Sequence, residues 1–281
     1  MSRFIRNTLI IFSLAAIALY VRIFMFTTPG VVNAEAVFLP VGQGDSELVR
    51  VGRVTMLIDA GPGQSVNRLL DGVIGIGKRI DIVLVSHGDS DHVSGLSGVL
   101  ASREVGVIAY SGTSTPLLNE LFAQARVRRV PIIPLTAGSS IAYGSSTIEI
   151  LWPTANADIV SRNDTSLVIA LRSNGDCALF TGDIDSKTES DLVAYYGEKI
   201  NCDVLKIAHH GSKYSSSAQF LQAVSPAVSV IEVGKNSYGH PAPETLARIT
   251  QAGSETWRTD TDGIVRIVFG MRKLNVYTIG F

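Results

Sequence analysis

The segment from Ser86 to His92 restricts the possible folds of this chain more than any other. It holds two imidazoles and two carboxylates within a few positions, namely His87, Asp89, Asp91 and His92. The segment directly follows an apolar run over 81–85, which predicts a buried strand. Histidine nitrogen and carboxylate oxygen both bind Zn²⁺, and carboxylate-rich sets also bind Mn²⁺. We therefore predict a metal site on a strand-to-helix turn, with a polar helix-capping loop as the alternative.

All histidines of the chain lie in turns that follow apolar, strand-like runs. They are His87, His92, His209, His210 and His240. Asp183 likewise follows the apolar run 177–181. If these strand ends share one edge, the side chains converge there, whereas taken singly each could be a capping or exposed polar residue. Convergence would suit two adjacent divalent metal ions, with Asp183 as the carboxylate that bridges them.

The N-terminal segment is apolar and contains Arg3 and Arg6 at its start, a pattern that predicts a cytoplasmic N-terminus and a translocated remainder. The length of the apolar stretch 4–26 is close to the roughly 20 residues needed to span a bilayer. The small residues 32–34 also allow signal-peptide cleavage after Ala34. We therefore expect a signal anchor or signal peptide (1–26), a linker (27–34) and one folded domain (35–281). The domain would lie outside the cytoplasm, held at the cell membrane by a single span, or secreted if cleaved.

Net charge and cysteine content set weaker limits. The formal net charge of −1 is no global signature of nucleic-acid binding, although a local basic groove is compatible with it. The two cysteines, Cys177 and Cys202, do not have the spacing of a cysteine-based zinc site. An oxidising compartment would allow one disulfide between them. Each also lies beside an apolar run, so two buried thiols are the alternative.

Hydrophobic periodicity predicts strands and helices over most of the folded domain. The expected strands are 36–39, 47–51, 54–58, 81–85, 105–110, 146–151, 165–171, 177–181, 203–208, 227–231, 264–269 and 273–279. The expected helices are 65–73, 115–127, 186–196, 217–224 and 243–252. This order indicates two similar halves, each with consecutive strands before alternating strands and helices. The simplest packing is two sheets face to face with helices outside each.

Several short motifs together resemble the metallo-β-lactamase fold, and in particular the extracytoplasmic metallo-β-lactamase-like domain of ComEC-type DNA-uptake proteins. They occur in the order Val41–Asp45, Leu57–Gly61, His87–His92, Asn163–Leu167, Thr181–Asp183, His209–Ser212, Tyr238–Pro241 and Arg258–Asp260. The resemblance covers about residues 35 to 281. The usual H-x-H-x-D-H signature of the fold has Asp89 in place of its second histidine here.

The resemblance implies an α/β (α+β) fold, a four-layer αββα sandwich, which the N-terminal transmembrane helix would precede. It also implies a hydrolase with two divalent metal ions, Zn²⁺ or Mn²⁺. His87 and Asp89 would bind one ion, Asp91 and His92 the other, and Asp183 would bridge them. Asp91 is expected to be catalytic as well.

The remaining roles also follow from the resemblance. His210 is the expected ligand of the adjacent histidine pair, which leaves His209 to contact or protonate the leaving group as a catalytic residue. His240 would be a further ligand or a phosphate contact. The fold usually has another histidine before the bridging aspartate. Asn163 or Asp164 occupies roughly that place here.

The expected function is a membrane-anchored, extracytoplasmic, metal-dependent phosphodiesterase or nuclease that acts on DNA, with the DNA-uptake machinery of competence as a partner. Ser212, Lys213 and Asn236 are candidate substrate-binding residues, although a serine-rich helix cap explains Ser212 equally well. One alternative is hydrolysis of a lactone, a lactam or a choline-phosphate ester on the same fold. Another is a non-catalytic module that binds DNA or a partner. The oligomeric state stays open.

Overall fold

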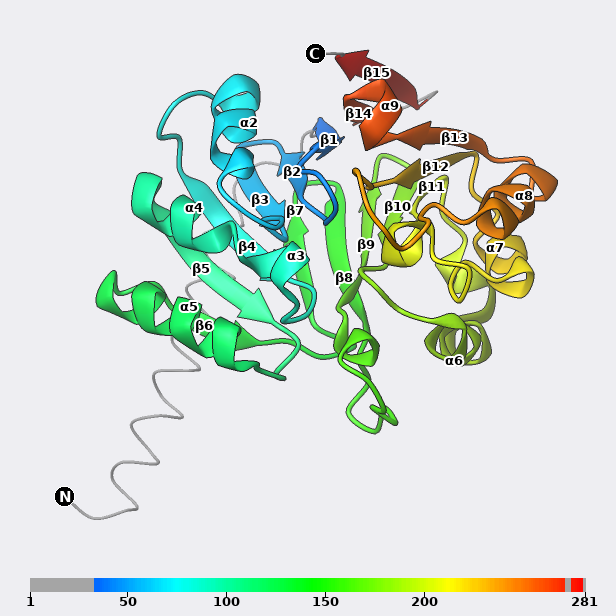
Figure 1. Cartoon of the computed structure of the whole chain (residues 1–281), viewed down its shortest axis with the longest axis horizontal. Helices are drawn as coiled ribbons and strands as arrows, with labels where there is room; N and C mark the ends of the chain where they lie inside the picture. The colour runs from blue at the N-terminus through cyan, green and yellow to red at the C-terminus, as the bar shows by residue number, and fades with distance from the viewer. Residues whose placement is uncertain (1–32, 271–273, 280–281) are drawn as a thin grey trace.

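Segments rich in Val and Ile, which favour extended backbone, form two β-sheets that pack face to face in the computed structural model (Figure 1). The structure describes residues 33–270 and 274–279. The first sheet has the strand order β15-β14-β1-β2-β3-β4-β5-β6. In that order its strands are Asn275–Ile279, Ile264–Phe269, Ala34–Phe38, Glu47–Val51, Val54–Ile58, Ile80–Val85, Val105–Tyr110 and Ile132–Pro134.

The second sheet has the order β13-β12-β11-β10-β9-β8-β7. In that order its strands are Glu255–Arg258, Val228–Ile231, Val204–Lys206, Asp176–Phe180, Val168–Ser173, Ser146–Trp152 and Ser140–Tyr143. Both sheets are antiparallel over one part and parallel over the other. In the first, β3 to β6 are parallel, and in the second, β10 to β13 are parallel. This repeated arrangement agrees with the two similar halves predicted from the order of elements.

The helices connect the parallel strands, because a parallel pair needs a long crossover that a tight turn cannot supply. The longer helices are α2 (Ser65–Ile74), α4 (Leu96–Ser102), α5 (Pro116–Val127), α6 (Ser186–Tyr196), α7 (Ala218–Val224) and α8 (Pro243–Gln251). Shorter turns are α3 (Ser90–Val93), η1 (Asn163–Thr165), η2 (Gly197–Ile200), η3 (Ala208–Gly211) and α9 (Thr259–Asp262). Figure 1 shows α2, α4 and α5 on one side of the sheets and α6, α7 and α8 on the other.

Three buried apolar clusters hold these layers together. The first lies between the first sheet and α2, α4 and α5, with Phe122 among its members. The second fills the space between the sheets, where the rings of Phe38 and Phe180 stack with centroids 5.9 Å apart. The third lies between the second sheet and α6, α7 and α8, with Phe220 among its members. The predicted αββα layering of the folded domain is therefore observed.

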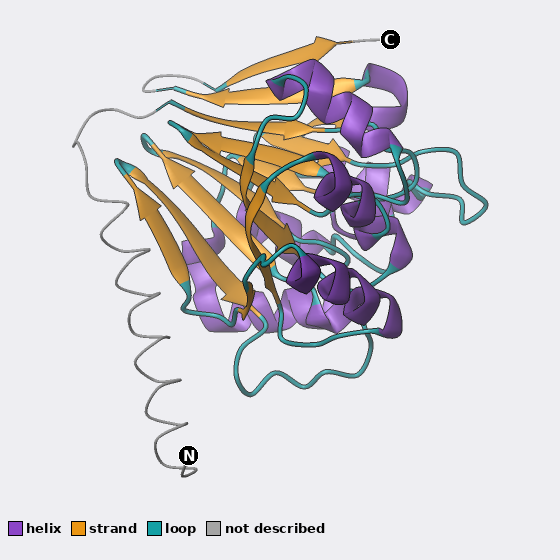
Figure 2. Cartoon of the chain, turned by 90° about the vertical axis from the view of Figure 1, so that its left-hand side faces the viewer, coloured by secondary structure: helices purple, strands orange, loops and turns teal. Residues whose placement is uncertain are grey.

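The strands that the sequence did not predict are β6, β7 and β13, and each lies at the edge of a sheet. An edge strand pairs on one side only and buries fewer side chains, so its apolar pattern is weak. The predicted strand 165–171 begins later, at Val168, because residues 163–165 form the turn η1. Figure 2 shows β15 at the other edge of the first sheet, beside the C-terminal end of the described chain.

The predicted membrane anchor or signal peptide over 1–26, and most of the linker over 27–34, lie outside the described residues. Ala34, which precedes the predicted cleavage point, is the buried first residue of β1 and pairs with Val51 and Phe269. Within 33–270 and 274–279, no helix has the length and apolar character needed to cross a membrane.

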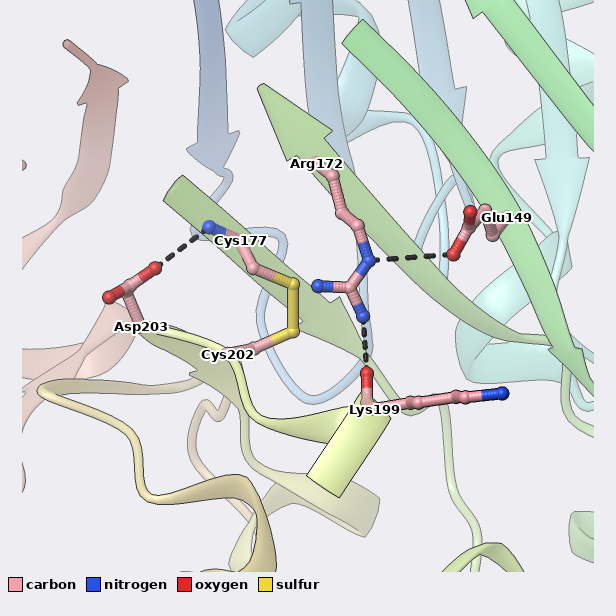
Figure 3. Close-up of a disulfide and its surroundings, with 6 residues drawn as sticks. All are labelled: Glu149, Arg172, Cys177, Lys199, Cys202 and Asp203. Carbon is pink, nitrogen blue, oxygen red and sulfur yellow. Dashed lines mark hydrogen bonds and ion pairs between the residues drawn. A yellow bond between two sulfur atoms is a disulfide. The ribbon is translucent and has the colours of Figure 1, made fainter. Parts of the chain in front are cut away.

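The two cysteines form a disulfide, which decides between the two alternatives left open by the sequence (Figure 3). Cys177 lies on β10, and Cys202 directly precedes the neighbouring strand β11, so that their Cα atoms are 4.6 Å apart. The backbone N–H of Cys177 also donates a hydrogen bond to Asp203 Oδ2 at 2.8 Å. The two parallel strands are thus joined covalently at the end where β11 begins.

Candidate metal centre

Side chains from three segments meet where the central strands of the two sheets end. Asp91 and His92 lie on α3 after β4, Asp183 follows β10, and His210 lies on η3 after β11. One ligand atom from each of these residues lies within 4.8 Å of all the others. The structure therefore brings four of the predicted metal ligands together, and they come from both sheets.

Asp183 is at the centre of this group. Its Oδ2 lies 3.3 Å from His92 Nε2 and 3.6 Å from His210 Nε2. The same nitrogen of His210 also lies 3.4 Å from Asp91 Oδ2. The Asp183 carboxylate therefore lies between imidazoles that come from two different segments of the chain.

Outer hydrogen bonds orient the two imidazoles of this group. His92 Nδ1 lies 2.7 Å from Asp59 Oδ2, and His210 Nδ1 lies 3.0 Å from the carbonyl oxygen of Glu232. A carbonyl oxygen only accepts, so the hydrogen of His210 is on Nδ1. In the neutral ring, Nε2 then presents a lone pair to the centre of the group. Histidines that bind metals commonly have such an outer acceptor.

Several buried atoms that face this centre form no hydrogen bond within the described part of the chain. Nε2 of His87, His92 and His210, together with Oδ1 of Asp183, form no hydrogen bond with any described residue. Buried polar atoms are hydrogen-bonded in the great majority of cases, so a group of unpartnered atoms calls for an explanation. Nitrogen and carboxylate donors that converge in this way match the ligands of Zn²⁺ and Mn²⁺. These residues therefore fit a divalent metal centre.

The electrostatics of the group also favour the binding of a cation. Burial opposes the imidazolium form of His210, but Asp183 and Asp45 outweigh it and raise the pKa of His210 to about 10. Burial would raise the pKa of Asp183, but His210 and His92 lower it well below the usual range. The carboxylates thus attract positive charge strongly, which protons or a metal ion can supply.

His87 and Asp89, the ligands predicted for the other metal ion, lie beside this group. The rings of His87 and His92 are 4.2 Å apart, and His87 Nε2 lies 3.8 Å from Asp89 Oδ2. Ser86 Oγ lies 3.0 Å from His87 Nδ1, which again leaves Nε2 facing inward. Arg162 pairs with Asp89 at 3.1 Å, a contact that sequence reasoning missed because the two residues are distant in the chain.

His209 and His240 lie further out. His209 and His210 both have left-handed backbone, with φ values of 50° and 53°, which is uncommon outside glycine and occurs often at functional sites. His209 Nε2 is 3.8 Å from Asp183 Oδ2, and its Nδ1 is 3.4 Å from Asn163 Nδ2. The ring of His240 is 5.5 Å from that of His209, and His240 is not part of the group of four.

A cleft of about 510 Å³ opens onto the group. Its floor includes Asp91, Asp183 and His210, and its wall includes Tyr238 and Arg162. The cleft draws residues from α5, from the loop that precedes α8 and from the turn near η1, so both halves of the chain contribute to it.

The three residues predicted to bind substrate do not line this cleft. Ser212 is buried, and its Oγ accepts a hydrogen bond from the backbone N–H of Tyr214. Lys213 lies over the ring of Tyr214, with Nζ 5.0 Å from the centroid. Asn236 uses its side-chain amide within its own loop. Sequence reasoning placed them near the site through proximity along the chain, and the directions of their side chains account for the difference.

A buried charged network beneath the centre was also missed. Lys206 pairs with Asp45, and its Nζ lies 3.8 Å from Asp183 Oδ1. Ligand atoms of Asp45, Glu47 and Glu232 lie within 4.8 Å of one another. The available signal was the occurrence of charged residues inside apolar strand segments, since Glu47 begins β2 and Lys206 ends β11.

A family model described as the metallo-beta-lactamase superfamily matches residues 39–234. ComE operon protein 3 of Bacillus subtilis (strain 168) is 30% identical over 192 residues, which are 67% of this chain and 24% of that protein. Competence protein ComA of Neisseria gonorrhoeae is 32% identical over 248 residues, which are 84% of this chain and 33% of that protein. The chain thus spans a quarter to a third of the length of these ComEC-type competence proteins.

Solved structures share the same fold. The metallo-beta-lactamase fold protein YhfI from Bacillus subtilis superposes with a TM-score of 0.57 at 13% identity, covering 83% of this chain and 99% of that chain. A likeness at this identity concerns the fold and leaves the reaction open.

Proposed function

The chain belongs to the metallo-beta-lactamase superfamily, and from this premise we propose that it is a metal-dependent phosphodiesterase that acts on DNA outside the cytoplasm. The family, with its ComEC-type relatives, confirms the resemblance seen in the sequence. The observation that carries the proposal is the convergence on Asp183 of histidine Nε2 atoms that form no hydrogen bond to a described residue, next to an open cleft.

In this proposal, Asp91, His92, Asp183 and His210 would hold one divalent ion, His87 and Asp89 would contribute to a second, and Asp183 would be a ligand common to both. When bound, the ions polarise a phosphoryl oxygen and lower the pKa of a water molecule. Water adds to phosphorus and releases one proton to the solvent of the open cleft, and the bond from phosphorus to the leaving oxygen breaks. His209 faces the cleft beside Asp183 and donates the proton that the leaving oxygen takes up.

Three observations support the choice of substrate and compartment. Arg162 supplies a positive charge at the wall of the cleft, where a phosphate oxygen can pair with it. The relatives are ComEC-type competence proteins, which supports a substrate encountered during DNA uptake. The Cys177–Cys202 disulfide fits an oxidising compartment. Anchoring to the membrane through residues 1–26 is part of the same proposal and rests on hydropathy.

The test uses the purified full chain, its metal content and a substrate panel. We expect bound divalent metal, together with hydrolysis of bis-p-nitrophenyl phosphate and of DNA in the presence of Mn²⁺ or Zn²⁺. A faster reaction with nitrocefin, with a lactone or with a choline-phosphate ester would favour the alternative esters. Absence of metal, of metal-dependent stabilisation and of all hydrolysis would favour a non-catalytic binding module.

The matched variants are Asp91→Asn and Asp191→Asn. The first removes a charge from the centre, and we expect it to lower phosphodiester hydrolysis by about 100-fold or more, by analogy with the effect of weakened metal sites. The second makes the same chemical change on the exposed surface of α6 and should leave the rate unaltered. Equal rates for both variants would contradict the assignment of the centre.

A further inference from the structure

An exposed tyrosine stands at the rim of the cleft. Tyr238 lines the cleft, and 76% of its surface is accessible to solvent. Its ring lies 5.7 Å from that of His240, at an interplanar angle of 31°. Neither the proposed metal centre nor the proposed proton transfer uses this tyrosine. It therefore offers a flat, unoccupied aromatic face next to the site of the reaction.

The loop that carries Tyr238 is held rigidly by Asn236. The side-chain Nδ2 of Asn236 donates to the carbonyl oxygens of Gly234 at 2.9 Å and of His240 at 2.8 Å. Its Oδ1 accepts from the backbone N–H of Tyr238 at 3.0 Å and from that of His240 at 3.1 Å. All four bonds lie within one short loop, so the backbone under both rings is fixed before any ligand arrives. A preorganised contact loses less entropy on binding.

Other residues that line the cleft suit an extended ligand. Pro116 and Leu117, at the start of α5, add apolar surface, and Arg162 adds a positive charge. Asp91, Asp183 and His210 of the His/Asp group line the same cleft. A nucleotide presents the complementary features, namely an anionic phosphodiester and a flat base. Base–aromatic stacking next to positive charge is the usual chemistry of single-strand recognition.

We propose that Tyr238, with His240 beside it, forms a stacking subsite for one unpaired base of a single-stranded nucleic acid. This inference rests on the proposed function, because the neighbouring phosphodiester would then lie over the His/Asp group. In a duplex both faces of each base are covered by the neighbouring base pairs, and a side chain reaches a face only after unstacking. The subsite therefore selects single strands or frayed ends over intact duplex.

The test measures binding, so that it does not depend on turnover. The full chain is titrated with fluorescent phosphorothioate oligothymidine, which resists hydrolysis, and with an abasic phosphorothioate strand of equal length. We expect Tyr238→Ala to weaken binding of oligothymidine by about tenfold, the scale of one base–aromatic contact, and to leave binding of the abasic strand unchanged. Tyr238→Phe keeps the ring and should bind as the unaltered protein does.

Tyr195→Ala is the matched control, because Tyr195 is 72% exposed, lies on α6 and does not line the cleft. It should leave both affinities unchanged. The unaltered protein should also bind oligothymidine more tightly than the corresponding duplex, and Tyr238→Ala should reduce that preference. Equal weakening of both strands by Tyr238→Ala, or no weakening of either, would overturn the subsite.

The two proposals fail separately. Hydrolysis of bis-p-nitrophenyl phosphate with no effect of Tyr238→Ala on binding rejects the subsite alone. Tyr238-dependent binding of oligothymidine without hydrolysis of any phosphodiester rejects the proposed reaction and leaves the subsite in place.

Discussion

Lys206 is completely buried, although its side chain carries a charged ammonium group. Its Nζ donates to the carbonyl oxygen of Gly182 at 3.0 Å and pairs with Asp45. Burial opposes the charged form, but Asp45 and Asp183 outweigh burial and raise the pKa of Lys206. The lysine therefore adds to the positive charge of His92 and His210 in compensating two buried carboxylates, and one of them is Asp183 at the candidate centre.

Replacing Lys206 by Met keeps the volume and removes the charge. We expect the free energy of unfolding to fall by about 3–5 kcal/mol, the usual cost of leaving one partner of a buried ion pair alone. Urea denaturation of the two proteins measures the difference. Lys187→Met, which removes the exposed pair with Asp158, is the control and should have little effect. A Lys206→Met protein as stable as the original would show that Asp45 is compensated by other groups.

Glu232 makes the stability of the protein depend on pH. Burial, and then the nearby charge of Asp45, raise the pKa of Glu232 to about 8. The folded protein therefore holds a proton that the unfolded chain releases near pH 4.5. The corresponding stabilisation is fully present below pH 4.5 and is lost as the pH rises toward 8.

Glu232→Gln imitates the protonated acid. We expect the fall in unfolding free energy between pH 5 and 8 to become shallower, because the amide does not titrate. Denaturation should be measured with a chelator present, so that metal binding adds no pH dependence. A slope equal to that of the unaltered protein would assign the titration to another group, such as the neighbouring Glu47.

At the scale of elements, the segments recognised most clearly in the sequence were central strands and long helices. Strand β5 and helix α6 have the predicted bounds. Strand β5 is an apolar run, and the start of α6 is fixed by Asp185, whose side chain accepts hydrogen bonds from the backbone N–H groups of Lys187 and Thr188. The missed strands β6, β7 and β13 are edges. The turn η3 was predicted as a place for histidines, but its left-handed conformation at His209 and His210 was not apparent, since both residues lack the flexibility of glycine.

The disulfide between β10 and the start of β11 closes a loop with a sequence separation of 25 residues. Loop-closure entropy predicts that Cys177→Ser together with Cys202→Ser costs about 3 kcal/mol of unfolding free energy. Reductant should destabilise the unaltered protein by a similar amount and leave the double variant unchanged, as followed by urea denaturation. If reductant destabilises both proteins equally, the effect does not come from this bond.

At the scale of the whole molecule, the last strands of the chain complete the first sheet. Strand β14 pairs with β1, more than two hundred residues earlier, and its Val265 and Ile267 belong to the cluster between the sheets. The local sequence pattern predicted that β14 is a strand, but it did not indicate which strand pairs with it. The two halves of the chain are therefore parts of one folding unit, and the cleft between them depends on both.

Two truncations separate β14 from β15. A chain that ends after Asp262 loses β14 and exposes the edge of β1, so we expect it to be insoluble or unfolded. A chain that ends after Gly270 loses β15, whose side chains are mostly exposed, and should keep its fold. Soluble yield and circular dichroism measure both. A folded chain that ends at Asp262 would show that β14 is dispensable.

The sequence by itself determined the type of fold and the stretches that carry the candidate site, because strand periodicity and the polar residues after each strand are local properties. It placed His87, His92, Asp183 and His210 at strand ends, and the structure brings them together. Only the tertiary structure decided which atoms face the centre. Asp59 and the carbonyl of Glu232 orient His92 and His210, and Lys206 lies beneath Asp183.

Tertiary packing also explains why some residues have a different position in the structure from the one predicted. Asn236 was predicted to line the substrate groove. Its amide is used within its own loop, and Tyr238 of the same loop lines the cleft. Arg162 lies 3.1 Å from Asp89 although the two residues are distant in the sequence. Side-chain direction and contacts between distant segments depend on how the two sheets meet, and that depends on the packing of the whole domain.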